Sequence, residues 1–126
     1  MDRQESLKEK RKYRRIIVSL KVTYKVTGDV GEAEIETVDI SAGGLSVMMN
    51  KILKTGTLLE INMSVEASAV FSCAGKVVWQ DMRPRRNGVG KFGYLTGLEF
   101  VGLELNERLR LIYYCHAKEK ARKEHR

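Results

Sequence analysis

Residues 16–26 are Ile-Ile-Val-Ser-Leu-Lys-Val-Thr-Tyr-Lys-Val, and their alternation indicates the fold class. Apolar side chains alternate with polar ones along this segment, and only Ile17 interrupts the pattern. Successive side chains of a β-strand point to opposite faces, so the alternation predicts a strand with one face in a core. The turn-forming residues 27–31, Thr-Gly-Asp-Val-Gly, predict where this strand ends.

Five further segments alternate in the same way downstream. They predict strands over about 33–38, 45–49, 59–65, 71–79 and 92–100. The apolar parity changes between Ile35 and Val38, which indicates a bulge before the loop at 39–44. Gly75 interrupts the fifth segment, where glycine often marks a bend or bulge.

The period of the pattern becomes helical near the C-terminus. Four residues recur at helical spacing: Leu109, Ile112, Tyr113 and His116. They predict an amphipathic helix over about 106–120, with Asn106 as its N-cap and Glu107 favoured by the helix dipole. Six short strands and one helix predict a mainly β chain, a six-stranded antiparallel barrel with a C-terminal α-helix.

Length and composition are those of one small globular domain. The chain has 126 residues with an ordinary apolar share, enough for a single core. No apolar run reaches the roughly 18 residues of a membrane-spanning helix, and the polar N-terminus lacks a signal peptide. We therefore expect a cytoplasmic protein without membrane insertion. Cys73 and Cys115 have no ligand-spaced partners, so we expect neither a metal site nor a cofactor.

The positive charge is concentrated at the two ends of the chain. Residues 1–15 hold seven Lys and Arg against three Asp and Glu, and residues 118–126 hold five against two. The segment between them is balanced. We expect a flexible N-terminal arm over 1–9, a domain over 10–117 and a basic C-terminal tail over 118–126. Charge placed this way suits a compact anion at least as well as a nucleic-acid polymer.

Two clusters could carry binding chemistry. The first is Lys10-Arg11-Lys12-Tyr13-Arg14-Arg15, which contains R-x-x-x-R as Arg11 and Arg15. A guanidinium makes paired hydrogen bonds to a phosphate or to the O6/N7 edge of guanine, so two of them could clamp a nucleotide. The alternative is a solvated arm with no ligand.

The second cluster is the turn from Asp39 to Gly44, with the pattern D-x-S-x-x-G. Asp39 can accept the N–H donors of a guanine edge, and the hydroxyl of Ser41 can both donate and accept. Gly43 and Gly44 allow a sharp turn and a close approach to a ligand. The alternative is a plain loop in which Asp39 and Ser41 cap the backbone.

Together the two motifs resemble the PilZ domain family. R-x-x-x-R stands directly before an alternating strand, and D-x-S-x-x-G follows one hairpin later, with Leu after its glycine. Lys76-Val77-Val78-Trp79 is similar to the penultimate strand of the family, and residues 94–100, Tyr-Leu-Thr-Gly-Leu-Glu-Phe, are similar to its last strand. The resemblance covers residues 10–117.

The resemblance implies a barrel that binds cyclic di-GMP. Arg11 and Arg15 would then hold phosphate and guanine groups, Asp39 and Ser41 would hydrogen-bond a guanine, and Gly44 would keep the turn tight. The resemblance also implies that such proteins bind either one ligand molecule or a stacked pair. Lys10 stands where the family often has arginine, at a position that influences this stoichiometry.

Three further residues are secondary ligand-binding candidates: Arg14, Gly43 and Trp79. Trp79 could stack on a base, although its place in the alternation is equally compatible with the core or the rim.

No nucleophile–base pair or carboxylate dyad is visible, so we expect a sensor and not an enzyme. Cyclic di-GMP would order the arm and relay a signal to an unidentified effector protein, in a motility or biofilm programme. One alternative is a PilZ-like interaction module without nucleotide binding. A less favoured one is a small basic nucleic-acid-binding barrel, which should expose aromatic side chains on a strand face.

Overall fold

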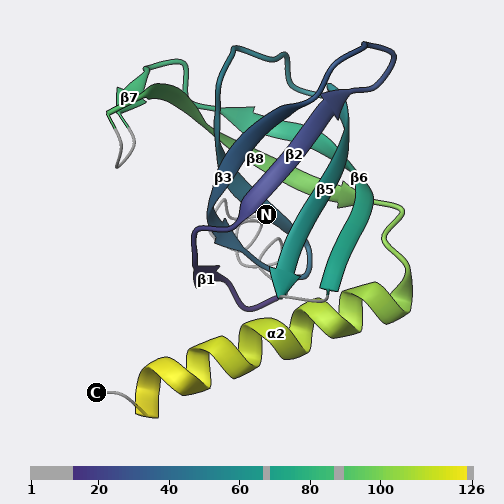
Figure 1. Ribbon diagram of the computed structural model, residues 1–126, viewed down its shortest axis with the longest axis vertical. Helices are drawn as coiled ribbons and strands as arrows, with labels where there is room; N and C mark the ends of the chain where they lie inside the picture. The colour runs from purple at the N-terminus through teal and green to yellow at the C-terminus, as the bar shows by residue number, and fades with distance from the viewer. Residues whose placement is uncertain (1–12, 67–68, 87–89, 125–126) are drawn as a thin grey trace, which may run out of the picture.

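The computed structural model describes residues 13–66, 69–86 and 90–124, which form eight strands and one helix (Figure 1). Their bounds are β1 (Ile16–Ile17), β2 (Lys21–Val26), β3 (Ala33–Ile40), β4 (Gly44–Met49), β5 (Leu58–Glu66), β6 (Ala69–Gln80), β7 (Arg85–Arg86), β8 (Phe92–Val101) and α2 (Leu105–Glu124). None of the described helical segments is long and apolar enough to cross a membrane.

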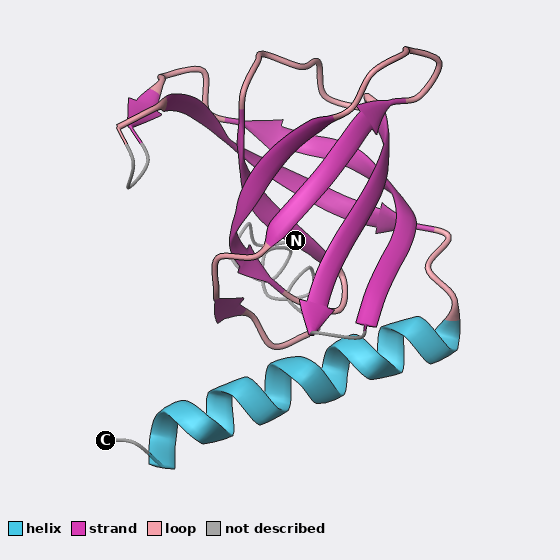
Figure 2. Cartoon of the chain, in the orientation of Figure 1, coloured by secondary structure: helices cyan, strands magenta, loops and turns pink. Residues whose placement is uncertain are grey.

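Strand pairing closes into a ring. β2 pairs with β3 and β5, β5 with β6, β6 with β8, β8 with β4, and β4 again with β3. Every pairing is antiparallel, and α2 runs across one end of the resulting barrel (Figures 1 and 2). The predicted six-stranded antiparallel barrel with a C-terminal helix is therefore confirmed. The short strands β1 and β7 are additions to this ring, paired with β3 and β8.

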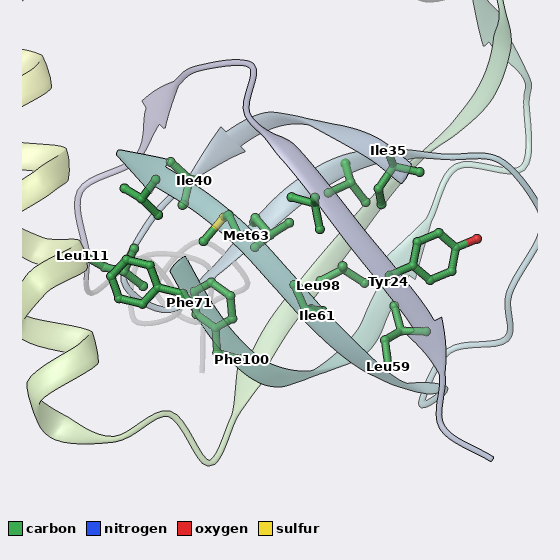
Figure 3. Packing of buried hydrophobic residues seen from close by; sticks show 14 of the residues in the cluster. Tyr24, Ile35, Ile40, Leu59, Ile61, Met63, Phe71, Leu98, Phe100 and Leu111 are labelled. Carbon is green, nitrogen blue, oxygen red and sulfur yellow. The ribbon is translucent and has the colours of Figure 1, made fainter. Parts of the chain in front are cut away.

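The core is built from the inward-facing side chains of all six long strands (Figure 3). Residues two apart along β2, β4 and β5 are almost completely buried, as the alternation predicts. These are Val22 and Tyr24, Leu45, Val47 and Met49, and Leu59, Ile61, Met63 and Val65. Leu111 of α2 belongs to the same buried cluster, so the helix closes the core at one end of the barrel.

The segment predicted as one strand over 16–26 is interrupted at residues 18–20. Thr37, which is buried, bridges the interruption from β3. Its hydroxyl donates to the Val18 carbonyl (2.6 Å) and accepts from the Leu20 amide (2.8 Å). The break costs little because a side chain supplies the hydrogen bonds that a regular ladder would have made.

Two bulges redirect side chains on the barrel. The predicted bulge in β3 is confirmed, because its register with β4 shifts between Thr37 and Asp39. Val38 already faces outward on the parity set by Ile35 and Thr37, and the bulge after Thr37 keeps Asp39 out of the core and returns Ile40 to it. In β6 the register with β8 shifts between Val77 and Trp79, whereas Gly75 lies in regular register with both neighbours, so no bulge occurs at Gly75.

The helix is longer than expected. It begins at Leu105, and the Glu104 carbonyl accepts a hydrogen bond from the Arg108 amide (2.9 Å), so Asn106 lies inside the first turn and is not the N-cap. The helix continues to Glu124, which makes residues 118–124 of the predicted basic tail helical.

The buried face of α2 also differs from the predicted one. Leu111, Tyr114 and Cys115 are buried, while Leu109, Tyr113 and His116 are exposed; of the four predicted residues only Ile112 packs against the core. The apolar residues of this segment fit helical spacing in two registers. Packing against the barrel selects the second of them.

Candidate ligand-binding site

Arg15 and Asp39 bring the two sequence motifs together. One guanidinium nitrogen of Arg15, Nη2, lies 2.9 and 3.1 Å from the carboxylate oxygens of Asp39 and 3.1 Å from Oγ of Ser46. The Arg15 side chain is 40% exposed and that of Asp39 is 21% exposed. The pair therefore lies at the surface, where a ligand can reach it. Arg11 and Lys10 lie outside the described residues.

Local backbone structure explains this meeting. Arg15 immediately precedes β1, which pairs with the end of β3 through Ile16↔Ile40 and Ile17↔Asp39. On the β3 parity set by Ile35 and Thr37, the Asp39 side chain would point into the core. The bulge between Thr37 and Asp39 turns this carboxylate outward, toward Arg15.

The same outer face continues across three more strands. Asp39 of β3 is registered with Ser46 of β4, Ser46 with Gly97 of β8, and Gly97 with Trp79 of β6. We call these four residues the outer row. Ser46 and Gly97 were not predicted as site residues, because alternation shows that both point away from the core but does not show which strands are neighbours.

Trp79 lies over Gly97. A Cβ added to Gly97 would stand 2.1 Å from Nε1 of the indole, so only glycine leaves room for the ring. The second bulge turns Trp79 out of the core, and the residue is 42% exposed. Trp79 is thus a rim residue with an accessible aromatic surface at the far end of the outer row.

The Asp39–Gly44 turn is held by its own serine. The Ser41 amide donates to the Gly44 carbonyl (2.9 Å), and the Ser41 hydroxyl accepts from the Gly43 amide (3.1 Å). Gly44 passes so close to β8 that an added Cβ would stand 2.1 Å from the Leu98 carbonyl oxygen. In this structure Ser41 caps the backbone, as the plain-loop alternative expected, and Gly44 is required for close strand approach.

Tyr13 and Arg14, which precede Arg15, lie against helix α2. The ring of Tyr13 packs on Gly43, with a contact of 3.2 Å to the Cβ position of that glycine. The guanidinium of Arg108 lies 5.4 Å from the centre of the Tyr13 ring. Arg14 forms an ion pair with Glu119, and its hydrogen bond lowers the pKa of that carboxyl. Arg14 therefore points to the helix and not along the outer row.

A small pocket of about 160 Å³ lies beside these contacts, between residues 13–14, the Asp39–Gly44 turn and α2. It is lined by Tyr13, Arg14, Ala42, Ile112, Cys115 and His116.

The chemistry of the site suits binding. Arg15 offers N–H donors, Asp39 offers acceptors, and Trp79 offers an aromatic surface. The two cysteines do not supply a nucleophile, because burial raises the pKa of the Cys73 and Cys115 thiols to about 11. Over the described ranges there is no cluster of three or more metal-ligating side chains.

The comparisons with known proteins agree with this architecture. The family model "PilZ domain" matches residues 9–117, whereas no curated protein matches the chain. Among solved structures, the PilZ domain of YcgR from Escherichia coli, determined with c-di-GMP, is 15% identical with a TM-score of 0.66, and the match covers 90% of this chain and 97% of that one.

Two longer proteins contain a similar barrel. The Bacillus subtilis inhibitor of motility MotI is 19% identical (TM-score 0.66), with 88% of this chain and 52% of that one covered. MrkH of K. pneumonia, in complex with c-di-GMP, is 15% identical (TM-score 0.69), with 90% and 55% covered. This chain thus spans about half of each. Because the family model covers most of the sequence and the barrel is the same, the chain belongs to the PilZ domain family.

Proposed function

We propose that this protein is a receptor for cyclic di-GMP, which it binds on the outer face of the barrel between the R-x-x-x-R arm, the N-terminal segment that ends at Arg15, and the Asp39–Gly44 turn. The observation that carries the proposal is the contact of Arg15 with Asp39, because it joins two motifs that are 24 residues apart. Membership of the PilZ family and the c-di-GMP bound to the similar barrels of YcgR and MrkH support the same ligand.

Each polar group has a role that follows from its chemistry. Arg15 donates to a phosphate or to the O6/N7 edge of a guanine, and Arg11 does the same from the arm. Asp39 accepts from the N–H groups on the opposite edge of a guanine. Ser41 and Gly44 act chiefly by holding the turn in shape, since the Ser41 hydroxyl is already bonded within it.

The outer row supplies the surface on which a base lies. Gly97 has no side chain, so the indole of Trp79 lies over it, in register with Ser46 and next to the Arg15–Asp39 pair along the row. Stacking on an exposed aromatic ring is worth about 1–3 kcal/mol per base in other nucleotide-binding proteins. Trp79 accordingly forms an aromatic wall, while Lys10, Arg14 and Gly43 remain secondary candidates beside the arm and turn.

Binding replaces catalysis in this proposal. The ligand bridges the arm and the barrel, orders the arm, and changes the surface presented to an effector protein. MotI, one of the similar proteins, is named as an inhibitor of motility, so we propose motility or biofilm control as the process. Such a switch responds only as strongly as the ligand prefers the ordered arm.

Isothermal titration with cyclic di-GMP tests the proposal, with GTP as the ligand control. We expect micromolar or tighter binding by the wild type. Arg15→Ala and Asp39→Ala each remove one partner of a charged contact and should cost about 2–5 kcal/mol of binding free energy. Asp29→Ala, in the exposed β2–β3 turn, should bind like the wild type.

The outcomes separate two kinds of failure. A wild type with no heat and no thermal shift would exclude the receptor function. Binding that survives in both Arg15→Ala and Asp39→Ala would keep the receptor but move its site elsewhere.

A further inference from the structure

One side chain of helix α2 contacts both segments of the candidate site. Nη1 of Arg108 donates to the Ala42 carbonyl (3.2 Å), in the middle of the Asp39–Gly44 turn. The same guanidinium lies over the ring of Tyr13 at 5.4 Å, and that ring packs on Gly43. Arg108 thus fastens the turn and the chain leading to Arg15 to each other and to the helix.

The hydrogen bond from Arg108 satisfies the carbonyl of a buried residue, Ala42, so its loss should disturb the turn. Ala42 is 1% exposed, and a buried carbonyl that loses its partner costs free energy unless the backbone moves to find another. Movement of Ala42 displaces the turn that carries Asp39. Movement of Tyr13 displaces Arg15, two residues later in the chain.

The helix is itself seated beside the site. Leu111 and Cys115 are buried against the barrel, and the Cys115 thiol lies 3.8 Å from the Ile40 carbonyl, next to Asp39. Farther along α2, Glu119 holds Arg14. The segment 13–15 is therefore attached to α2 through Tyr13 and Arg14, and to the barrel through the bonds of Arg15 with Asp39 and Ser46.

We propose that Arg108 is a positioning residue for the cyclic di-GMP site, and that through it ligand binding and the seating of α2 are coupled. The inference rests on the proposed function. Arg108 bonds neither Asp39 nor Ser46. It holds in place the turn that carries Asp39 and the segment that carries Arg15, which lowers the entropic cost of ordering them when the ligand binds. Because coupling is reciprocal, a ligand that tightens the turn and residues 13–15 must also tighten α2.

The chain offers a matched control on the same helix. Arg110 also stacks on an aromatic ring, that of Phe71 at 4.8 Å, and has no bond to the turn. Arg110→Ala therefore removes an arginine and a ring contact while leaving the turn intact. Arg108→Lys keeps the charge and a donor within reach of Ala42 but loses the planar stacking on Tyr13.

The experiment measures cyclic di-GMP affinity by titration and amide hydrogen exchange of α2 with and without ligand, using the full chain. We expect Arg108→Ala to weaken binding about tenfold, Arg108→Lys to recover part of that loss, and Arg110→Ala to stay within about twofold of the wild type. Ligand should slow exchange over 105–115 in the wild type and in Arg110→Ala, but much less in Arg108→Ala.

The possible failures are distinct. If the wild type binds and Arg108→Ala binds equally well, this inference is overturned while the receptor function stands. Equal losses in Arg108→Ala and Arg110→Ala, or no rescue by lysine together with unchanged α2 exchange in the wild type, would reduce Arg108 to a packing residue. A wild type that does not bind overturns the proposed function and this inference with it.

Discussion

Two glycines shape this candidate site because the side chains they lack leave room for neighbouring groups. Gly44 is the last residue of D-x-S-x-x-G, and its φ is not in the left-handed region. Its requirement comes from β8, whose Leu98 carbonyl occupies the place a Cβ would need. Gly97 leaves room for an indole in the same way. The glycines therefore define where strand and ring lie on the outer face.

Replacing Gly44 by alanine should destabilise the protein. The added Cβ would stand 2.1 Å from the Leu98 carbonyl oxygen, and backbone must move to relieve the overlap. Overpacking of this kind costs about 1–3 kcal/mol of unfolding free energy. Urea unfolding followed by circular dichroism measures the loss. Gly43→Ala is the control, because its added Cβ meets a side chain, that of Tyr13 at 3.2 Å, and not the backbone. Equal stabilities for the two variants would contradict the explanation.

Gly97→Ala should move Trp79 without unfolding the barrel. The new methyl group would overlap the indole, but Trp79 is 42% exposed and can swing toward solvent. Because Trp79 is the only tryptophan in the sequence, a changed emission maximum reports this movement directly. Cyclic di-GMP affinity should fall in parallel, as the aromatic wall is displaced. Unchanged emission in Gly97→Ala, with Gly43→Ala as reference, would show that the ring does not lie over Gly97.

At the scale of elements, two bulges orient the site. One lies between Thr37 and Asp39 and the other between Val77 and Trp79, at the two ends of the outer row. Each turns outward a side chain that strict alternation would have directed into the core. The barrel can thus keep Ile40 and Val77 buried while presenting a carboxylate and an indole on the same outer face.

The helix offers a test of which face is buried. Leu111 is 0% exposed, so Leu111→Ala should cost about 2–5 kcal/mol of unfolding free energy through lost contacts and a cavity. Leu109 is 39% exposed, and Leu109→Ala should cost less than about 1 kcal/mol. Denaturant unfolding of the two variants measures the difference. A larger loss for Leu109→Ala would mean that the helix packs in the register predicted from sequence.

At the scale of the whole molecule, the closed barrel and its helix bury Cys115 and partly bury Cys73. Burial raises the pKa of Cys73 and Cys115 from the usual 9 to about 11, with Glu107 adding to the shift at Cys73. In the unfolded chain these thiols ionise first as pH rises, so the unfolded state gains stability before the folded state does. Their contribution to folding is complete below pH 9 and is lost between pH 9 and about 11.

Stability should therefore decline at alkaline pH, in part because of these thiols. We expect the unfolding free energy of the wild type to fall more steeply from pH 9 to 10.5 than that of a Cys73→Ala/Cys115→Ala double variant. Tyrosines and lysines also titrate in this range, so the slope difference between the two proteins is the measurement. Equal slopes would show that the thiols are accessible to solvent.

The strands of the fold and the bulge that orients Asp39 could be predicted from the alternation of apolar and polar residues. Alternation located all six barrel strands, and the parity change between Ile35 and Val38 predicted the β3 bulge that the structure contains. The same reasoning failed where two solutions were equally periodic, as for Leu109 and Leu111 on α2. It also failed at residues 18–20, which alternate like a strand. There the Thr37 hydroxyl, and not a backbone group of β3, bonds the Val18 carbonyl and the Leu20 amide.

The sequence by itself determined the barrel class, the existence of a helix and the positions of both motifs, because these depend on periodicity and on residue types close together in the chain. Only the tertiary structure decided that Ser46 and Gly97 join Asp39 and Trp79 in one row, since strand neighbours are set by closure of the sheet. It also decided that Arg108 reaches the turn at Ala42, 66 residues earlier, because only packing of α2 brings them together.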